Sequence, residues 1–290
     1  MIAPWANSHK AGIPHMSGAH DYFTTSDGLA LHYAMDDFTD PWVTPQTVIL
    51  LHAAMGDSQR AYRWVPVLAR HFRVVRPDMR GHGQSGVPAD GALSFDRLVD
   101  DVTELANHLD CATFHVAGAS VGGIIALQLA LDHPQRVTTL GCFATPPGLK
   151  RHTRIDHDQW ISRIRESGLR GFLEATIDER FPAGTDAGFI RWFIDAASHT
   201  DTDFLFRLIP MMREVDQTSR LHEIRQPTLA VVPGDDPHIA RAQYEALRAI
   251  PDCEFVVYDG YPHNIVDAAP ERCARELLDF LTKHPARGAT

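Results

Sequence analysis

Short apolar segments alternate with segments of helical periodicity along most of the 290 residues. Residues 47–51 and 228–232 are apolar runs, which are typical of strands buried on both faces of a parallel sheet. The segment after Ser94 instead has apolar residues at helical spacing, namely Leu98, Val102, Leu105 and Leu109. Strands and helices that alternate in this way build a parallel sheet with helices on its faces, so the sequence predicts the α/β fold class.

The alternation stops in the second half of the chain. From about residue 148 to residue 223 only helical patterns occur, and they are rich in arginine and aromatic residues. We therefore predict an α/β core domain formed by residues 19–147 and 224–290, with a helical cap subdomain of residues 148–223 inserted after the sixth strand. Residues 1–18 have little periodicity and are predicted to form a loose N-terminal lead-in.

The chain carries 27 Lys and Arg residues against 37 Asp and Glu residues, a formal net charge of -10. This balance argues against binding to nucleic acid or to an anionic membrane, because both require basic patches. No segment approaches the roughly 18 apolar residues of a membrane helix, and the first residues lack the apolar core of a signal peptide. The four cysteines have no CxxC spacing and are interpreted as buried residues in a reducing compartment. We therefore predict a cytoplasmic protein.

The strongest chemical signal is the run Gly-Ala-Ser-Val-Gly-Gly at residues 118–123, between a predicted strand and a predicted helix. A serine in this G-x-S-x-G pattern sits on a sharp turn with its hydroxyl exposed above the sheet, and the turn needs small neighbours. A serine hydroxyl is a weak nucleophile near neutral pH and needs an adjacent base. We predict that Ser120 is a nucleophile; the alternative is a glycine-rich structural turn.

His263 follows the last predicted strand, at the sheet edge where the carboxyl ends of parallel strands and their loops meet. It is predicted to be the base. His238, beside the predicted acid, is expected to be a loop histidine, and the alternative is that it approaches the pocket. The base needs a carboxylate that holds its tautomer and stabilises the imidazolium. Asp235 and Asp236 both follow the strand at residues 228–232, and both are candidates for this acid.

Taken together, these motifs resemble those of the α/β-hydrolase superfamily, and the resemblance covers the chain from about Tyr22. The run His-Ala-Ala-Met-Gly at residues 52–56 resembles the family's oxyanion turn. Residues 78–86 closely match its D-x-R-G-x-G-x-S motif, and residues 262–271 resemble the segment that contains its catalytic histidine.

The resemblance implies a role for each matching residue. Asp236, which precedes a proline, takes the register of the catalytic acid in preference to Asp235. The backbone N–H groups of Ala54 and Val121 would form the oxyanion hole. His52 and the Arg-Gly-His-Gly segment would brace the loops around the nucleophile without taking part in the chemistry.

The implied activity is hydrolysis of a carboxylic ester or lactone of small to moderate size, through an acyl-enzyme on Ser120. In these features the chain looks most like enol-lactone hydrolases and related small esterases. A carbon–carbon bond hydrolase of aromatic degradation is the alternative enzyme, and a non-hydrolytic ligand receptor on the same fold is a third interpretation. No cofactor or metal is implied, because the triad and the oxyanion hole suffice for acyl transfer. The expected partner is a small-molecule substrate, with a monomer and a homodimer both open.

The predicted cap is expected to roof the active site and to select the substrate. Most of its aromatic and methionine residues are expected to pack the cap on the core, and a minority to line an apolar pocket. Its arginines include Arg163, Arg180, Arg191 and Arg207. Solvent exposure is the default expectation for them, and binding of a substrate carboxylate through a bidentate pair is the alternative for one of them.

Overall fold

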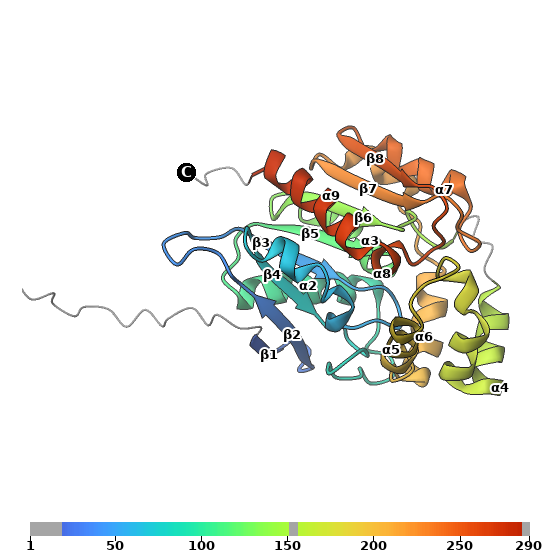
Figure 1. Cartoon of the computed structure of the whole chain (residues 1–290). Helices are drawn as coiled ribbons and strands as arrows, with labels where there is room; N and C mark the ends of the chain where they lie inside the picture. The colour runs from blue at the N-terminus through green and yellow to red at the C-terminus, as the bar shows by residue number, and fades with distance from the viewer. Residues whose placement is uncertain (1–18, 151–155, 286–290) are drawn as a thin grey trace, which may run out of the picture.

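The computed structural model describes residues 19–150 and 156–285, so the predicted lead-in lies outside the described residues. Eight strands form one sheet in the order β1-β2-β4-β3-β5-β6-β7-β8 (Figure 1). Strand β1 pairs with β2, and β2 with β4, in antiparallel fashion, whereas the other neighbours are parallel. The predicted, mostly parallel sheet is confirmed. The strands are β1 (Ala19–Thr24), β2 (Ala30–Asp36), β3 (Thr47–Leu51), β4 (Arg73–Pro77), β5 (Phe114–Ala119), β6 (Val137–Phe143), β7 (Thr228–Pro233) and β8 (Cys253–Tyr258).

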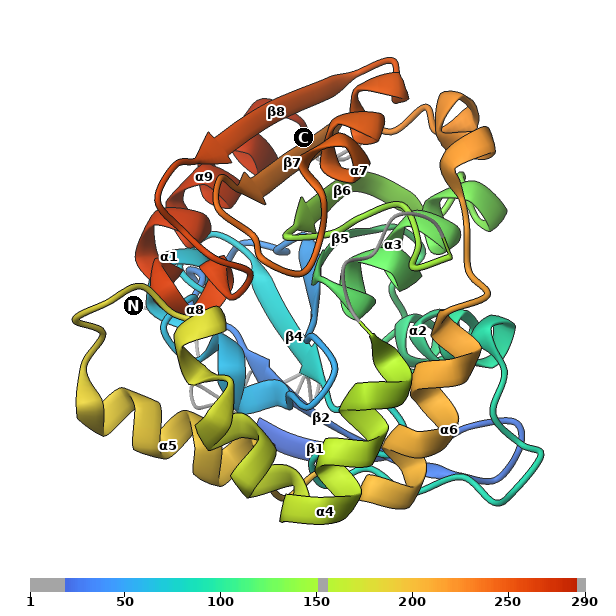
Figure 2. The same cartoon turned by 90° about the vertical axis from the view of Figure 1, so that its right-hand side faces the viewer.

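Helices cover both faces of this sheet (Figures 1 and 2). Successive strand residues point to opposite faces, so Ile49 and Leu51 pack with residues of α2 and α3, whereas Val48 and Leu50 pack with residues of α1 and α9. The apolar runs are therefore buried on both sides. The helices of the core are η1 (Ser58–Ala61), α1 (Val65–Leu68), α2 (Phe95–His108), α3 (Val121–Asp132), α7 (Arg241–Glu245), η4 (Ala246–Ala249), α8 (Ile265–Ala268) and α9 (Pro270–Lys283).

Between β6 and β7 the described chain forms helices and contributes no strand to the sheet. We call residues 156–223 the helical region, and Figures 1 and 2 show its helix α4 next to α5 and α6. Each of these three helices begins after an aspartate whose side chain accepts a backbone N–H of the first turn, namely Asp156, Asp186 and Asp201. The elements of the region are α4 (His157–Ala175), η2 (Ile177–Glu179), α5 (Ala187–Ala197), α6 (Thr202–Met212) and η3 (Thr218–Glu223).

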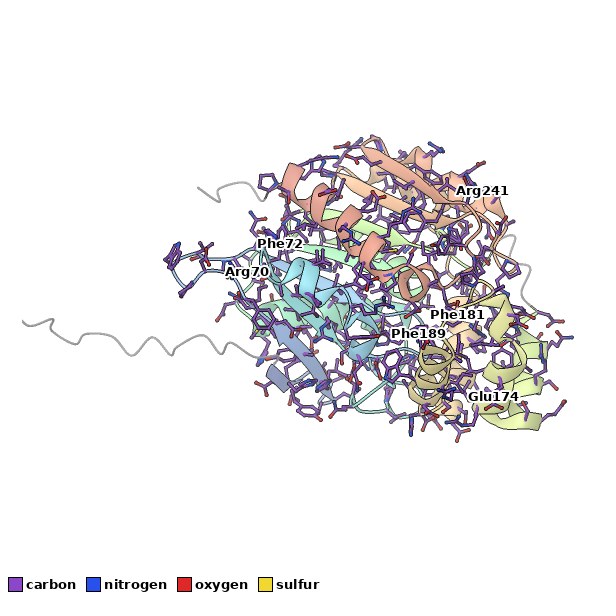
Figure 3. All side chains as sticks on the ribbon, in the orientation of Figure 1. Arg70, Phe72, Glu174, Phe181, Phe189 and Arg241 are labelled. Atoms are coloured by element: carbon purple, nitrogen blue, oxygen red, sulfur yellow. The ribbon has the colours of Figure 1, made fainter. Side chains whose placement is uncertain are left out.

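Aromatic side chains hold the helical region together and attach it to the core. Phe181 and Phe189 lie edge to face, with ring centroids 5.5 Å apart (Figure 3). Phe193 packs on Phe181 at 4.8 Å, and the guanidinium carbon of Arg60 in the core lies 4.1 Å from the centroid of Phe193.

Within residues 19–150 and 156–285, no helix combines the length and the apolar character that a membrane span requires.

Candidate active site

Ser120 lies at the turn between β5 and α3. Its backbone has φ 51° and ψ -115°, a conformation that is costly for a residue with a side chain. Gly122 packs so closely against the end of β3 that a Cβ atom there would lie 2.5 Å from the carbonyl oxygens of Leu51 and His52. The close approach of these backbones explains why the turn requires small residues next to the serine.

The structure brings Ser120, His263 and Asp236 together from three loops. Nε2 of His263 lies 3.1 Å from Oγ of Ser120, and Nδ1 of His263 lies 2.7 Å from Oδ2 of Asp236. The three residues follow β5, β8 and β7, which are parallel, so their carboxyl ends lie at one edge of the sheet. Of the two candidate acids, Asp236 is buried against the histidine, whereas Asp235 is exposed.

Asp236 is held by three donors besides His263. Its carboxylate accepts hydrogen bonds from the backbone N–H groups of His238 and Ile239 and from the hydroxyl of Tyr244. Burial by itself would raise the pKa of Asp236, but the charge of His263 and these hydrogen bonds outweigh burial and lower the pKa well below its usual range. The acid therefore stays ionised and can stabilise a protonated imidazole.

Tyr244 is a residue that sequence reasoning missed. It is fully buried in α7, and its hydroxyl lies 3.3 Å from Nδ1 of His263 as well as against Asp236. The one available signal is chemical, since a buried tyrosine hydroxyl needs a hydrogen-bond partner. The sequence does not identify that partner, because Asp236 and Tyr244 meet only when the loop after β7 folds back on α7.

The two predicted oxyanion-hole residues, Ala54 and Val121, line the same cavity as Ser120. Val121 is the first residue of α3, so its N–H has no partner within the helix. Neither amide donates a hydrogen bond to another described residue. The turn that contains Ala54 is held by His52, whose Nδ1 lies 2.8 Å from the carbonyl oxygen of Ala53 and whose Nε2 accepts the N–H of Met79 at 2.9 Å.

The Arg-Gly-His-Gly segment lies behind this turn and outside the cavity. Arg80 is fully buried and donates two hydrogen bonds of 2.6 Å to Asp101 and one of 2.9 Å to Asp27. The ring of His82 packs edge to face on that of His52, with centroids 5.0 Å apart. Both residues therefore support the loop, and neither reaches the serine.

The cavity over Ser120 is lined by the core loops on one side and by the helical region on the other. Its wall is largely apolar. It includes Leu149, Trp160, Leu173, Phe193, Leu205, Leu208, Ile209, Met212 and Ile239. Its polar side chains, besides those of Ser120 and His263, are Arg60, His157, Arg180, His238 and Asn264.

His238 differs from the expectation of a plain loop histidine. Its ring is buried in the cavity wall, with its centroid 6.1 Å from that of His263. Its position follows from Asp236, whose side chain accepts the backbone N–H of His238 and turns the loop inward. Burial, together with the nearby charges of His263 and Arg180, lowers the pKa of His238 to about 4, so this ring is neutral at physiological pH.

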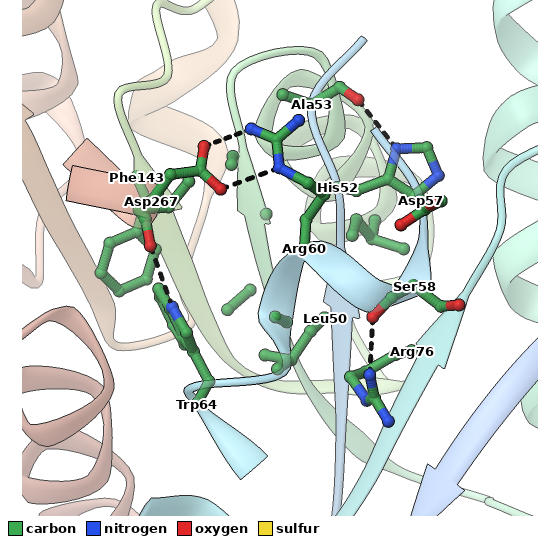
Figure 4. Close-up of a pocket in the computed structure, with 16 residues that line it drawn as sticks. Leu50, His52, Ala53, Asp57, Ser58, Arg60, Trp64, Arg76, Phe143 and Asp267 are labelled. Carbon is green, nitrogen blue, oxygen red and sulfur yellow. Dashed lines mark hydrogen bonds and ion pairs between the residues drawn. The ribbon is translucent and has the colours of Figure 1, made fainter. Parts of the chain in front are cut away.

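A second cavity lies behind the turn at residues 52–56 and shares Ala53 and Arg60 with the first one (Figure 4). In the wall of this cavity Arg60 forms a two-point ion pair with both carboxylate oxygens of Asp267.

Among the described residues, no group of three or more His, Cys, Asp or Glu side chains is arranged to hold a metal ion.

Known proteins are similar to this chain in sequence and in structure. A family model described as alpha/beta hydrolase fold matches residues 46–181. RutD of Agrobacterium fabrum, which is named as a candidate carbamate hydrolase, is 29% identical over 262 residues, covering 87% of this chain and 98% of that protein. The crystal structure of a hydrolase from Pseudomonas aeruginosa is similar with a TM-score of 0.80 and 27% identity, covering 91% of this chain and 99% of that chain.

The enol-lactonase of Burkholderia xenovorans is similar in fold, with a TM-score of 0.82 and 24% identity, covering 90% of this chain and 100% of that chain. The chain is therefore a hydrolase with the α/β-hydrolase fold.

Proposed function

We propose that the chain is a serine hydrolase that cleaves a carboxylic ester or lactone through an acyl-enzyme on Ser120. The observation that carries this proposal is the continuous series of contacts from Asp236 through His263 to Ser120, with distances of 2.7 Å and 3.1 Å. This series ends at the cavity, where a carbonyl carbon can approach the serine oxygen.

Each residue of the site then has a chemical role. Oγ of Ser120 attacks the carbonyl carbon while its proton moves to Nε2 of His263, and Asp236 stabilises the imidazolium. The N–H groups of Ala54 and Val121 stabilise the oxyanion. When the tetrahedral intermediate collapses, His263 donates the proton to the leaving alkoxide. Water then attacks the acyl-enzyme with His263 as base, which releases the acid and regenerates the serine.

The helical region acts in this proposal as a cap that selects the substrate. It contributes Trp160, Leu173 and four residues of α6 to the cavity wall, so the acyl or leaving group would lie against it. An apolar wall with a few polar groups is typical of small-molecule sites.

For the location we propose the cytoplasm, because all four cysteines are free and free thiols suit a reducing compartment.

Carbamate cleavage is a second candidate function. It is favoured by RutD proteins, which are named as candidate carbamate hydrolases and match this chain over nearly their whole length in Agrobacterium fabrum and Variovorax paradoxus. The carbonyl carbon of a carbamate can be attacked by the same serine, so the triad alone does not discriminate between the two bonds.

The test is the release of nitrophenol from short and medium acyl esters by the native protein and by Ser120→Ala. We expect steady turnover by the native chain and a loss of at least about 10⁴-fold in kcat in the variant, because a triad without its nucleophile retains only the oxyanion hole and binding. The matched control is Ser162→Ala, an exposed serine of α4, which should keep native turnover.

A fluorophosphonate probe provides an independent readout, since it should add to the native chain and to Ser162→Ala but not to Ser120→Ala. Turnover of nitrophenyl carbamates well above that of the matched esters would favour the second candidate. Failure of the folded native protein on esters, lactones and carbamates would contradict the proposal. Carbon–carbon hydrolysis or simple ligand binding would then need to be tested.

A further inference from the structure

Arg180 projects from the end of η2 into the wall of the active-site cavity. Its side chain is packed between aromatic rings, with the guanidinium carbon 5.5 Å from the centroid of Trp160 and 5.6 Å from that of Phe172. Its backbone carbonyl accepts the N–H of Asn264 at 3.3 Å, and Asn264 directly follows His263. Arg180 is therefore held in a defined position relative to the base.

The guanidinium of Arg180 has no carboxylate partner in the described structure. The residue is only 5% exposed, and its Nη2 is buried without a hydrogen-bond partner among the described residues. Among the described residues its side chain makes one hydrogen bond, a long one of 3.4 Å from Nε to Oγ1 of Thr176. The carboxylate of the neighbouring Glu179 is half exposed and lies 3.7 Å from Nε2 of His238 instead.

The other arginine of the cavity, Arg60, has the opposite environment. Its Nε and Nη2 both donate to the carboxylate of Asp267, so its charge is neutralised within the protein (Figure 4). No Asp or Glu occurs among the described residues that line the cavity, and the segments outside the described ranges contain no Asp or Glu. Arg180 is thus an uncompensated cation in the cavity of a protein whose formal net charge is -10.

A buried cation without a partner has a large desolvation cost. Burial lowers the pKa of Arg180 to about 10, with smaller and opposed contributions from Glu179 and Arg60, so the side chain is still protonated near neutral pH. A planar guanidinium with free N–H groups is suited to bind a carboxylate through charge-assisted hydrogen bonds.

We propose that Arg180 binds a carboxylate of the substrate, so that the preferred substrate is an anionic ester or lactone. This inference rests on the proposed function and narrows its substrate class. With the carboxylate on Arg180, the rest of the substrate lies in the apolar cavity and its carbonyl group faces Ser120. Arg180 is then a specificity-determining residue that touches the substrate outside the reacting bond.

The test compares pairs of esters that differ in one charge. The first pair places the charge on the acyl chain, as in mono-(4-nitrophenyl) glutarate against 4-nitrophenyl pentanoate. The second pair places it on the leaving group, as in 4-carboxyphenyl butyrate against 4-acetylphenyl butyrate. The proteins are the native chain, Arg180→Met, Arg180→Lys and the control Arg163→Met. Arg163 also lies over Phe172, at 5.5 Å, but does not line the cavity.

We expect the native chain to prefer the anionic member of at least one pair in kcat/KM. Arg180→Met should reduce this preference by about 100-fold, since hydrogen bonds to charged groups are among the strongest in proteins. Arg180→Lys should retain part of the preference, and Arg163→Met all of it. A native preference for the neutral member of both pairs, or an equal loss on both members in Arg180→Met, would overturn the inference.

The two proposals fail in different ways. Turnover of neutral esters without any dependence of charge preference on Arg180 refutes only the substrate class, whereas no turnover of any ester, lactone or carbamate refutes the proposed function. If Arg180→Met does not fold, competitive inhibition of the native protein replaces the variant. Glutarate should inhibit at least about ten-fold more strongly than the uncharged glutaramide at equal ionic strength. Equal inhibition by the two compounds would overturn the inference.

Discussion

In the part of the chain that the structure describes, two histidine–aspartate pairs have the same distance between the ring nitrogen and the carboxylate oxygen. In one, Nδ1 of His263 lies 2.7 Å from Oδ2 of Asp236, and in the other, Nδ1 of His32 lies 2.7 Å from Oδ2 of Asp78. The side chains of the two aspartates are 2% and 1% exposed. The distance within the pair therefore does not distinguish the site next to Ser120 from the structural contact.

The difference lies in the second nitrogen of each ring. Nε2 of His263 faces a serine hydroxyl in the cavity, whereas Nε2 of His32 lies 3.0 Å from Nδ1 of His20 and 3.3 Å from the amide nitrogen of Gln84. The pair at His32 lies where β2 meets the loop after β4, and neither of its residues lines the cavity over Ser120. A histidine–aspartate pair can serve catalysis only when its other nitrogen meets a reacting group.

The two aspartates also serve different neighbours. Asp236 accepts hydrogen bonds from the loop that contains His238, next to the reacting atoms. Asp78 accepts the backbone N–H groups of Ser58 at 2.5 Å and Gln84 at 2.8 Å, so it ties two loops of the core together. We therefore expect substitution of the first to affect mainly turnover and of the second to affect mainly stability.

The largest effect is expected from Asp236→Asn. The amide can no longer hold the reactive tautomer of His263 or stabilise its protonated form, so kcat should fall by about 10⁴-fold. The measurement is ester turnover under saturating substrate. Asp235→Asn is the matched control, because Asp235 is exposed and should change kcat by less than about three-fold. A larger loss in Asp235→Asn than in Asp236→Asn would reverse the assignment of the acid.

The next effect is expected from Asp78→Asn. The variant loses the contact between its carboxylate and Nδ1 of His32 and places an amide nitrogen among donors, which should lower the free energy of unfolding by about 3 kcal/mol. Urea unfolding at neutral pH measures this change, and kcat of the folded fraction should fall by less than about ten-fold. A loss of activity as large as that of Asp236→Asn without destabilisation would show that the pair at His32 also supports turnover and not mainly stability.

The stabilising effect of Asp78 should also depend on pH. Burial by itself would raise the pKa of Asp78, but the backbone N–H of Gln84, the nearby His52 and the N–H of Ser58 lower it below 3.8. A carboxylate with a lowered pKa stabilises the fold above its unfolded pKa and loses this effect as the pH falls through the folded value. The gap in unfolding free energy between the native chain and Asp78→Asn should thus be constant from about pH 8 to 5 and shrink below about pH 4. A gap that widens in acid would contradict this assignment.

The smallest effect is expected from His238→Gln. Because burial keeps the pKa of His238 at about 4, this ring does not titrate between about pH 5 and 8, and glutamine preserves a neutral polar group. We expect kcat/KM on neutral esters to change by less than about five-fold, with the same shape of the pH profile. A displaced acid limb would mean that His238 contributes to the titration of activity.

Local features of the sequence were sufficient for the sheet and for the serine turn. A strand buried on both faces needs a run of apolar residues, and the turn at Ser120 needs glycine where backbones come within van der Waals contact, as at Gly122. The apolar run and the glycine each lie within a few consecutive residues, so both can be recognised in the sequence alone. That His263 lies near Asp235 or Asp236 was also predictable, because parallel strands bring their following loops to one edge. The preference for Asp236 came from the resemblance to the α/β-hydrolase superfamily.

The remaining features depend on contacts between distant segments, and only the tertiary structure decided them. Tyr244 became a partner of Asp236, and His238 became part of the cavity wall, through the fold of one loop. Arg60 and Arg180 are both arginines near the serine, yet one is paired with Asp267 and the other is not. Burial and charge pairing depend on contacts between distant segments and leave no local pattern in the sequence. The sequence by itself therefore determined the sheet and the serine turn, and the tertiary structure decided which charged and polar side chains around Ser120 are buried or paired.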